Sequence, residues 1–347
     1  MEAEMASAQL TGTTSEATPD WLRPHAPDGR LGRTNRARDW AEIQERMLVP
    51  LYQAVYERLE VGPATSLLGI GCRSGLALLL AAERGAQVAG AEADPELREL
   101  ATARGLTVHQ EPATGTRPAA RPDAHPGTHP GTRSGTGTHS GAHAGAHPGA
   151  HPGTSSGAHL STRPGAHPDH RPGTRTAEPV ARSAHSLVTV FEQLQTTRAP
   201  GLLVEAAARR VLTGGQLVLA AWGPAERCES ASVLELGQRL AGSGPAVRAG
   251  LLPGPFALST PGGLESLLFR AGLRPAGGGR VSCPFAYPDL ESAVRGLLST
   301  GLFDAALAES GGTLVAKELE EALHPFVLPD ASVRMTNLFR YVVGERA

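Results

Sequence analysis

The sequence predicts an α/β fold in which helices pack on both faces of a doubly wound, mostly parallel sheet of seven strands. Short apolar runs alternate with helical patterns along most of the chain, and strands separated by helices of this length pair in parallel. Glycines follow several of the helical patterns, as expected where short helices end in tight loops. A helical lid and a long disordered insertion are predicted to complete this single domain.

Composition excludes several classes of protein. The chain has 347 residues, with 32 Lys and Arg against 34 Asp and Glu, and a formal charge of −2. It therefore lacks the broad basic field of a dedicated nucleic-acid binder. Three widely spaced cysteines are typical of reduced thiols. No apolar stretch of about 18 residues occurs and the start lacks a signal-peptide pattern, so we expect a cytoplasmic protein without a membrane partner.

Residues 112–182 are predicted to be a disordered insertion rich in His, Gly, Pro and Thr. Tetrads such as Ala146-His147-Pro148-Gly149 recur, and frequent Pro and Gly forbid helices and paired strands. Nine of the thirteen histidines lie there, and they are interpreted either as part of a repeat-expanded linker or as weak, adventitious metal ligands. No dedicated metal site is predicted. The insertion interrupts one domain, residues 38–347, between strands three and four, and residues 1–37 are expected to form a mobile leader.

The part before the insertion predicts three helices and three strands. Apolar residues recur at steps of three and four from Asp39 to Leu59, and Asp39 with Glu42 resembles a capping box. Asp94 is expected at the N-cap of a later helix whose first turn contains Pro95. Strands are expected at 65–70, 87–91 and 106–109, and helices at 39–59, 76–84 and 95–104.

The part after the insertion continues the alternation and adds two extra stretches. Strands are expected at 186–191, 216–222, 279–285 and 339–343, and helices at 202–212, 230–240, 290–298 and 314–323. The sheet does not require residues 224–261 and 289–328, and we expect them to fold over its carboxyl edge as the lid. Their aromatic residues favour an apolar small molecule as ligand. A contact between two copies of the chain, a homodimer, is the competing explanation for the same apolar helices.

The turn after the first strand carries the main functional signal. It reads Gly69-Ile70-Gly71-Cys72-Arg73-Ser74-Gly75, and its glycines allow a ligand to approach main-chain N–H groups at the start of the next helix. Ligands of such sheets bind at the carboxyl edge, where the strand order reverses. Glu92, at the end of the second strand, can accept hydrogen bonds from both hydroxyls of a ribose. Ser74 stands where the dinucleotide fingerprint needs glycine, which disfavours an NAD-dependent oxidoreductase.

Together with this turn, two further segments resemble the class I S-adenosylmethionine-dependent methyltransferases, a family with a Rossmann-like fold. Val88-Ala89-Gly90-Ala91-Glu92-Ala93-Asp94-Pro95 is similar to the family's second strand with its ribose-binding acid, and residues 209–217 to the turn that enters strand five. The resemblance, to the type that actinobacteria use on small molecules, covers about 240 residues. It implies S-adenosylmethionine as the cofactor and a small-molecule methyl acceptor as the partner.

The resemblance also implies a set of cofactor-binding residues. Gly71 and Gly75 would contact the cofactor through their main chain, and Glu92 would bind its ribose. Glu111, at the end of the third strand, would stand near the adenine amino group. The glycine loop is degenerate at two places: Gly69 replaces an acid and Arg73 replaces the middle glycine. Arg73 would either pair with the carboxylate of the cofactor or repel its sulfonium, an effect of about 4 kcal/mol at 4 Å near a surface.

Around the acceptor the sequence is less informative. Glu192 follows the fourth strand at the catalytic edge and is the candidate general base, although a solvent-facing loop position is an alternative interpretation. Trp222 is predicted either to form an apolar substrate wall or to fill the core. Cys72 is expected to be a small buried packing residue. His185, at the amino-terminal end of its strand, is expected to lie away from catalysis.

Two functions follow from these observations. The first is an enzyme, a methyltransferase that acts on a small organic acceptor; it needs little side-chain chemistry because alignment of donor and acceptor supplies most of the acceleration. The second is a catalytically inactive protein of the methyltransferase fold that binds or regulates a partner. Gly69, Arg73 and the absence of the family's Phe-Asp at the start of strand four favour the second.

Overall fold

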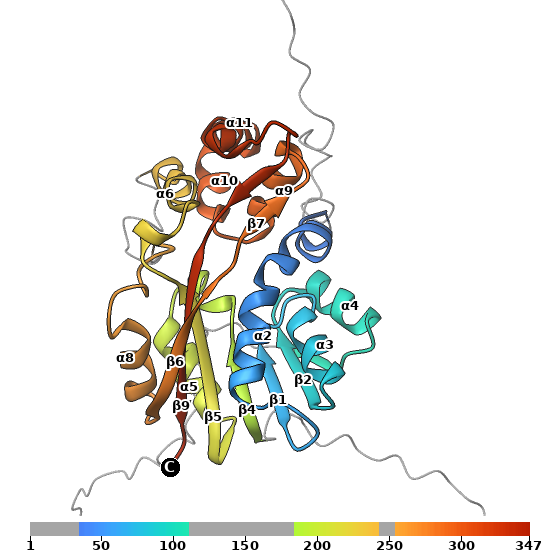
Figure 1. Ribbon diagram of the computed structural model, residues 1–347, viewed down its shortest axis with the longest axis vertical. Helices are drawn as coiled ribbons and strands as arrows, with labels where there is room; N and C mark the ends of the chain where they lie inside the picture. Colours follow the sequence, from blue (N-terminus) through green and yellow to red (C-terminus); the bar gives the residue numbers. More distant parts are fainter. Residues whose placement is uncertain (1–34, 111–183, 243–253) are drawn as a thin grey trace, which may run out of the picture. The chain divides into compact units, whose positions relative to one another are not determined.

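The computed structural model describes residues 35–110, 184–242 and 254–347, which belong to one compact unit. A seven-stranded sheet runs through it in the order β3-β2-β1-β4-β5-β9-β6, and a two-stranded sheet pairs β7 with β8 (Figure 1). Its strands are β1 Ser66–Ile70, β2 Gln87–Glu92, β3 Val108–Gln110, β4 His185–Val190, β5 Val211–Trp222, β6 Arg274–Ser282, β7 Phe285–Tyr287, β8 Val333–Met335 and β9 Leu338–Glu345. β3, β2, β1, β4 and β5 pair in parallel, and β9 lies antiparallel between β5 and β6. The predicted α/β class with a mostly parallel seven-stranded sheet is confirmed.

Helices cover both faces of this sheet, because successive strand residues point to opposite sides. Leu67 of β1 packs into a core with the helices α2 Val49–Arg58, α3 Leu76–Glu83 and α4 Pro95–Ala103. Leu68, one residue on, packs into a second core with α5 Pro200–Ala208 and α8 Gly263–Arg270. The crossover helices therefore change face between β1 and β4, which makes this the switch point of the sheet.

The first helical segment is less regular than the single helix predicted from Asp39 to Leu59. Residues 35–39 are already helical, which is earlier than the predicted end of the leader, and they continue into a π-helical turn, Trp40–Gln44, and a 3-10 turn, Glu45–Leu48, before α2. Pro50 in the first turn of α2 has no N–H to continue the ladder, which accounts for the break. The predicted capping box is wrong. Asp39 has helical backbone torsions and its side chain accepts no hydrogen bond from the N–H groups of this segment; its carboxylate instead forms an ion pair of 2.6 Å with Arg295.

The other predicted helices and strands form, and their ends differ most at β5 and β6. Val211 and Leu212, expected in a helix, belong to β5, and α5 already ends at Ala208. Val211 pairs with His185 of β4 and is fully buried, so tertiary packing outweighs the local helical pattern. The strand predicted at 279–285 is two strands, because Pro284 lacks the N–H that a continuous ladder requires.

The second half of the chain places a helical layer over the carboxyl ends of the parallel strands, as predicted for the lid. It comprises α6 Ala231–Leu240, α9 Leu290–Ser299, α10 Asp304–Ser310 and α11 Gly312–Leu323, at the top of Figure 1. α6 packs on α10 and α11. Leu234 and Leu319 are buried in this packing, so the apolar faces of these two helices are covered within the chain.

No helix among the described residues is long and apolar enough to cross a membrane. The predicted leader, apart from residues 35–37, and the predicted insertion at 112–182 lie outside the described residues. The interval that contains the predicted insertion follows β3 and precedes β4 in the described chain. β3 ends at Gln110, beside Glu92 at the carboxyl end of β2. The chain returns at His185, at the amino end of β4.

Candidate functional site

The glycine turn connects β1 to α3 at the switch point, and packing accounts for glycine at its key positions. Gly71 and Gly75 have left-handed φ angles of 62° and 87°, which side chains other than glycine rarely adopt. A Cβ on Gly71 would lie 2.6 Å from the Gln193 side chain, and one on Gly75 would lie 2.2 Å from Leu106. The N–H of Gly71 donates to the carbonyl of Ala91. The turn is therefore fixed against its surroundings before any ligand binds.

Two neighbouring positions of the turn are also explained by packing. Gly69 lies within β1, where a Cβ would come 3.0 Å from Leu78 of α3, so a side chain at this position would meet an apolar one. Cys72 is buried, and its Sγ is the atom that a Cβ on Gly90 would strike at 2.7 Å. Its burial agrees with the predicted packing role.

Main-chain donors hold the Glu92 side chain in place at the end of β2. Its carboxylate is only 5% exposed and accepts hydrogen bonds from the N–H of Arg73 at 2.8 Å and of Asp94 at 2.9 Å. Asp94 caps α4 as predicted, and its side chain accepts hydrogen bonds from the N–H groups of Glu96 and Leu97. Each carboxylate oxygen can accept a second hydrogen bond. Glu92 is thus rigid, buried and still able to bind hydroxyl groups.

A cavity of about 350 Å³ opens beside Glu92. Its walls come from the glycine turn, the start of α4, the loop between α9 and α10, and the first helical residues; they include Arg36, Ala37, Arg73, Glu92, Ala93, Asp94, Leu97, Ser299, Gly301 and Asp304. An ion pair of 2.5 Å between Arg36 and Asp304 joins two of these walls. The volume is within the usual range of small-molecule sites, and its walls mix apolar groups with a few polar ones. We name it the Glu92 cavity.

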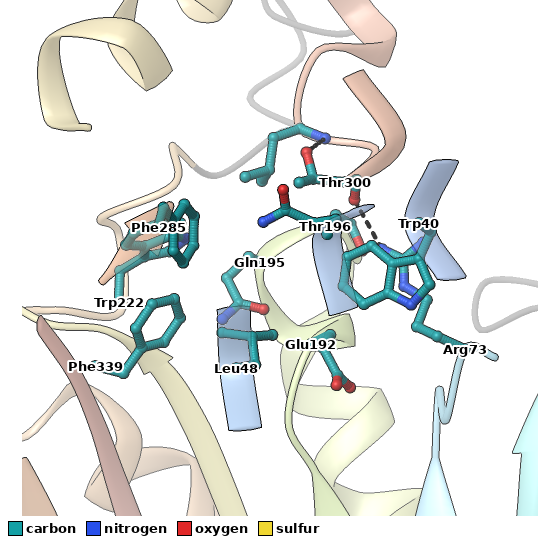
Figure 2. A pocket seen from close by; sticks show the side chains of 12 residues that line it. Trp40, Leu48, Arg73, Glu192, Gln195, Thr196, Trp222, Phe285, Thr300 and Phe339 are labelled. Atoms are coloured by element: carbon teal, nitrogen blue, oxygen red, sulfur yellow. Dashed lines mark hydrogen bonds between the residues drawn. The ribbon is translucent and has the colours of Figure 1, made fainter. Parts of the chain in front are cut away.

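A second, smaller cavity of about 40 Å³ lies between β4, β5, β9 and the lid. Figure 2 shows Trp222, Phe285 and Phe339 gathered on one of its sides; Gln195 and Glu192 also line it, and the Glu192 carboxylate points away from the three rings. The Trp222 ring lies 4.4 Å from that of Phe339 and 5.6 Å from that of Phe285, measured between centroids. Trp222 is therefore both a core residue and a cavity wall, the two alternatives that its sequence position left open. We name this space the aromatic cavity.

Arg73 lines both cavities and stands between them. Its backbone is left-handed, with φ of 52°, which costs a residue with a side chain about 1–2 kcal/mol. The guanidinium lies over the Trp40 ring at 4.7 Å from its centroid and donates to the carbonyl of Thr300 at 2.7 Å (Figure 2). The side chain thus links the glycine turn to the first helical segment and to the lid.

Glu192, directly after β4, is largely enclosed and does not face bulk solvent as a loop residue would. Its carboxylate accepts a hydrogen bond from the hydroxyl of Tyr52, a fully buried residue of α2. Burial raises the pKa of Glu192 to about 7, although the Tyr52 hydrogen bond and the nearby Arg73 charge lower it. Burial and the same carboxylate raise the pKa of Tyr52 well above its usual value. Glu192 therefore changes charge near neutral pH.

The structure brings most of the sequence-predicted site residues to one edge. Gly69, Gly71, Arg73 and Gly75 lie at the end of β1, and Glu92 and Glu192 at the ends of β2 and β4. Glu111 lies outside the described residues. His185 lies at the opposite, amino end of β4, where its Nδ1 is 3.0 Å from the Ser66 hydroxyl. Among the described residues, no cluster of His, Cys, Asp or Glu could hold a metal ion.

Three residues of the site were missed in the sequence. Tyr52 and Trp40 belong to the predicted first helix; the apolar periodicity included Trp40 but not Tyr52, and it indicated the partner of neither. Thr300 contributes a carbonyl, which any residue has, so no sequence signal could have found it. The stretch containing Thr300 was predicted as part of the lid, and that placement is the only available clue.

Comparisons with known proteins give weak similarities. No family model and no curated protein matches the chain. Among solved structures it is similar to a Bacillus halodurans C-125 protein provisionally described as a methyltransferase, with 11% identity, a TM-score of 0.45, and coverage of 85% of this chain and 99% of that chain. It is also similar to a geranyl diphosphate methyltransferase in complex with SAM, with 12% identity, a TM-score of 0.42, and coverage of 95% and 96%. A third is geranyl diphosphate C-methyltransferase from Streptomyces coelicolor A3(2), bound to Mg²⁺, geranyl diphosphate and S-adenosyl-L-homocysteine, with 11% identity, a TM-score of 0.37, and coverage of 85% and 79%.

Proposed function

We propose that the protein is an S-adenosylmethionine-dependent methyltransferase that acts on a small organic acceptor. One observation carries the proposal. At the switch point of the sheet, a cavity of about 350 Å³ beside the buried Glu92 carboxylate adjoins an aromatic cavity that contains a second carboxylate, that of Glu192. A nucleoside cofactor and a small acceptor would thus lie next to each other, at sites that share Arg73 and Thr196 as lining residues.

The chemistry of the Glu92 cavity fits a nucleoside. Glu92 would hold the ribose hydroxyls with the lone pairs that Arg73 and Asp94 leave free. Leu97 and Ala93 offer apolar contacts for a base. Gly71 and Gly75 shape the turn that carries Arg73, and Gly69 lies in the strand before it. Glu111 would stand near the amino group of the adenine, as the resemblance implies.

S-adenosylmethionine, when bound, supplies a methyl group on a positively charged sulfonium, which is a strong electrophile with a neutral leaving group. The protein's own contribution is then to position the donor and the acceptor and to exclude water from them. The lid helices and the aromatic side chains of Trp222 and Phe339 cover the carboxyl edge. Alignment of the two reactants is worth a large part of the acceleration in such a reaction. Arg73 would bind the carboxylate of the cofactor's amino-acid part.

The second candidate, a catalytically inactive binding protein, is favoured by the position of the Arg73 guanidinium. Its charge lies between the two cavities, where it would repel a sulfonium by about 4 kcal/mol at 4 Å and an effective dielectric constant near 20. The neutral thioether S-adenosylhomocysteine would not be repelled in this way. Binding of the product without binding of the donor would therefore indicate the inactive protein.

Calorimetric titration of the full chain with S-adenosylhomocysteine and with S-adenosylmethionine tests both candidates. We expect dissociation constants in the micromolar range for both ligands if the protein is a methyltransferase. Affinity for the thioether alone supports the inactive binding protein. If neither ligand binds at millimolar concentration, the Glu92 cavity is not a site for this cofactor and the methyltransferase proposal fails.

A further inference from the structure

A third cavity at the carboxyl edge, of about 440 Å³, is not explained by the proposed function. Its walls come from the segment after β4, the second half of α6, the loop between α9 and α10, and the start of α10. The lid helices thus form a large part of its surface, and we name it the lid cavity. Its volume is within the usual range of sites for small molecules.

The lid cavity shares walls with both of the other cavities. Thr196 lines all three of them. Gly301 and Asp304 line the lid cavity and the Glu92 cavity, and Leu302 lines the lid cavity and the aromatic cavity. The aromatic cavity, with about 40 Å³, holds only a few atoms, since one water molecule already needs about 10–15 Å³. An acceptor of ordinary size therefore needs further room, and the lid cavity provides it beside the cofactor site.

The lid cavity contains one positive charge that no carboxylate of the protein neutralises. Arg198 follows the 3-10 turn Gln193–Gln195 and lines the cavity, and among the described residues it has no ion-pair partner. Asp304, the other charged residue of the described walls, already pairs with Arg36 at 2.5 Å. A guanidinium group binds a carboxylate or a phosphate with two parallel N–H groups. The charge of the cavity therefore favours an anionic ligand.

The remaining walls of the lid cavity are suited to the rest of a small organic molecule. Gln195 and Gln238 contribute amide groups, which can donate to oxygen atoms of a ligand. Ala241, Leu302 and Ala305 contribute apolar surface. Apolar walls with a few polar groups are typical of sites that bind organic molecules. The cavity thus matches a molecule with an anionic end and an aliphatic part.

We propose that the methyl acceptor is an organic anion, with a carboxylate or phosphate group, and that Arg198 binds this group in the lid cavity. This inference rests on the proposed function, because it names the class of acceptor for the same enzyme. Arg198 lines the lid cavity but neither the Glu92 cavity nor the aromatic cavity. The anionic group is therefore held away from the wall shared with the cofactor site. It serves to recognise the acceptor, and another part of the molecule receives the methyl group.

A matched set of probes tests this inference without turnover. Ligand-observed NMR titration of the full chain at pH 7.5 compares hexanoate with hexanamide, its neutral analogue of the same length, and with pentyl phosphate. We expect at least one of the two anions to bind about fivefold more tightly than hexanamide, because hydrogen bonds between two charged groups are stronger than neutral ones. The anion that binds more tightly shows whether the site selects a carboxylate or a phosphate.

Arg198→Gln tests which residue produces the preference for anions. The variant removes the charge, so hexanoate and pentyl phosphate should bind no more tightly than hexanamide does. Arg198 is exposed and has no ion-pair partner in the described part of the chain, so we expect a nearly unchanged melting temperature. Arg209→Gln is the matched control: it removes an equal charge from an exposed position at the end of α5, and the preference should persist.

Ala305→Phe tests the place of binding. Ala305 is a partly buried residue of α10 that lines the lid cavity but not the Glu92 cavity. A phenyl ring at this position would fill part of the lid cavity, so all three probes should bind several-fold more weakly. Affinity for S-adenosylhomocysteine should not change, which also shows that the variant is folded. Ala305→Ser, which is similar in size to the natural residue, should bind the probes normally.

Three outcomes would overturn the inference: anions that bind no more tightly than hexanamide, a preference that Arg198→Gln leaves intact, or unchanged probe binding in Ala305→Phe. A failure of the proposed function is read separately, from the titration with S-adenosylhomocysteine, which involves the Glu92 cavity. Binding of this nucleoside without a preference for anions rejects only the acidic acceptor. A preference for anions without binding of the nucleoside keeps the anion site but rejects its role in methyl transfer.

Discussion

The Glu92 cavity and the aromatic cavity, both at the carboxyl edge, are held together by different kinds of contact. The Glu92 cavity is organised by main chain: the N–H groups of Arg73 and Asp94 hold the carboxylate, and the Ala91 carbonyl holds the turn. The aromatic cavity is organised by side chains, through the Trp222 stack and the Tyr52 hydrogen bond. Main-chain contacts survive most substitutions, whereas side-chain contacts change with each one. The first cavity is thus suited to a fixed cofactor and the second to a variable acceptor.

The largest expected effect is a loss of protein stability when one wall of the aromatic cavity is removed. Trp222→Ala removes the side chain of a residue that is 4% exposed and whose ring packs against those of Phe285 and Phe339. We expect the free energy of unfolding to fall by about 3–5 kcal/mol, as for other buried aromatic truncations. Denaturant unfolding measures this loss, and calorimetry below the unfolding midpoint should show unchanged affinity for S-adenosylhomocysteine. A parallel loss of affinity would mean that the cavities are not independent.

A second effect concerns the charge within the aromatic cavity. Because burial raises the pKa of Glu192 from 4.5 to about 7, the folded protein binds this proton more tightly than the unfolded chain does. Stability from this group is therefore present below about pH 4.5 and is lost as pH rises through 7, by up to about 3 kcal/mol. Glu192→Gln should remove that pH dependence. Melting temperatures between pH 5 and 8.5 measure it, and parallel curves for the two proteins would contradict the assignment.

A third effect concerns the cofactor side alone. Glu92→Ala should weaken binding of S-adenosylhomocysteine by about 1.5–3 kcal/mol, because charge-assisted hydrogen bonds to the ribose are lost. Glu83→Ala, at an exposed position of α3, is the control. Since Glu92 also holds the turn, Glu92→Gln serves as a second variant that keeps an acceptor. Unchanged affinity in both Glu92 variants would reject ribose binding by this residue.

A smaller effect is expected at the boundary between the cavities. Arg73→Gly relieves a left-handed backbone but loses the contacts to Trp40 and Thr300, so we expect little net change in stability. It should raise the affinity for the sulfonium relative to the thioether by about tenfold, since a positive charge is removed. The measurement is the ratio of the two dissociation constants, compared with that of Arg73→Lys, which keeps the charge. An equal ratio in all three proteins would show that the guanidinium does not act on the sulfonium.

The smallest effect is expected from the insertion. Replacing residues 115–180 with a short linker should leave the melting temperature nearly unchanged, because closing a shorter loop gains only about 0.6 kcal/mol for each halving of its length. Differential scanning calorimetry measures the difference. A loss of more than a few degrees would show that these residues contribute to the packed domain.

Sequence reasoning worked best where local rules decide the structure. The Asp94 cap and the left-handed Gly85 and Gly105 after α3 and α4 follow from short-range patterns. It failed where distant contacts decide. Val211 belongs to a strand because it pairs with His185. The Asp39 carboxylate does not cap its helix but accepts a hydrogen bond from Arg295, more than 250 residues away.

The candidate site divides in the same way. The turn from Gly71 to Gly75 and the acid Glu92 were found from spacing, because a main-chain site leaves a pattern of glycines. The partners Tyr52 of Glu192 and Thr300 of Arg73 come from segments far away in the sequence, with ordinary helical patterns of their own. No short motif could have indicated these pairings.

The neighbouring positions of β1 and β4 in the sheet have a consequence for how the protein can be divided. β4 enters between β1 and β5, so the polypeptide before Gln110 and the polypeptide after residue 184 share one layer of strands. Two separately expressed fragments, cut in that interval, would each expose an unpaired edge. Their reassociation would rebuild the crevice at the β1 and β4 ends, so ligand binding could report on complementation of the halves.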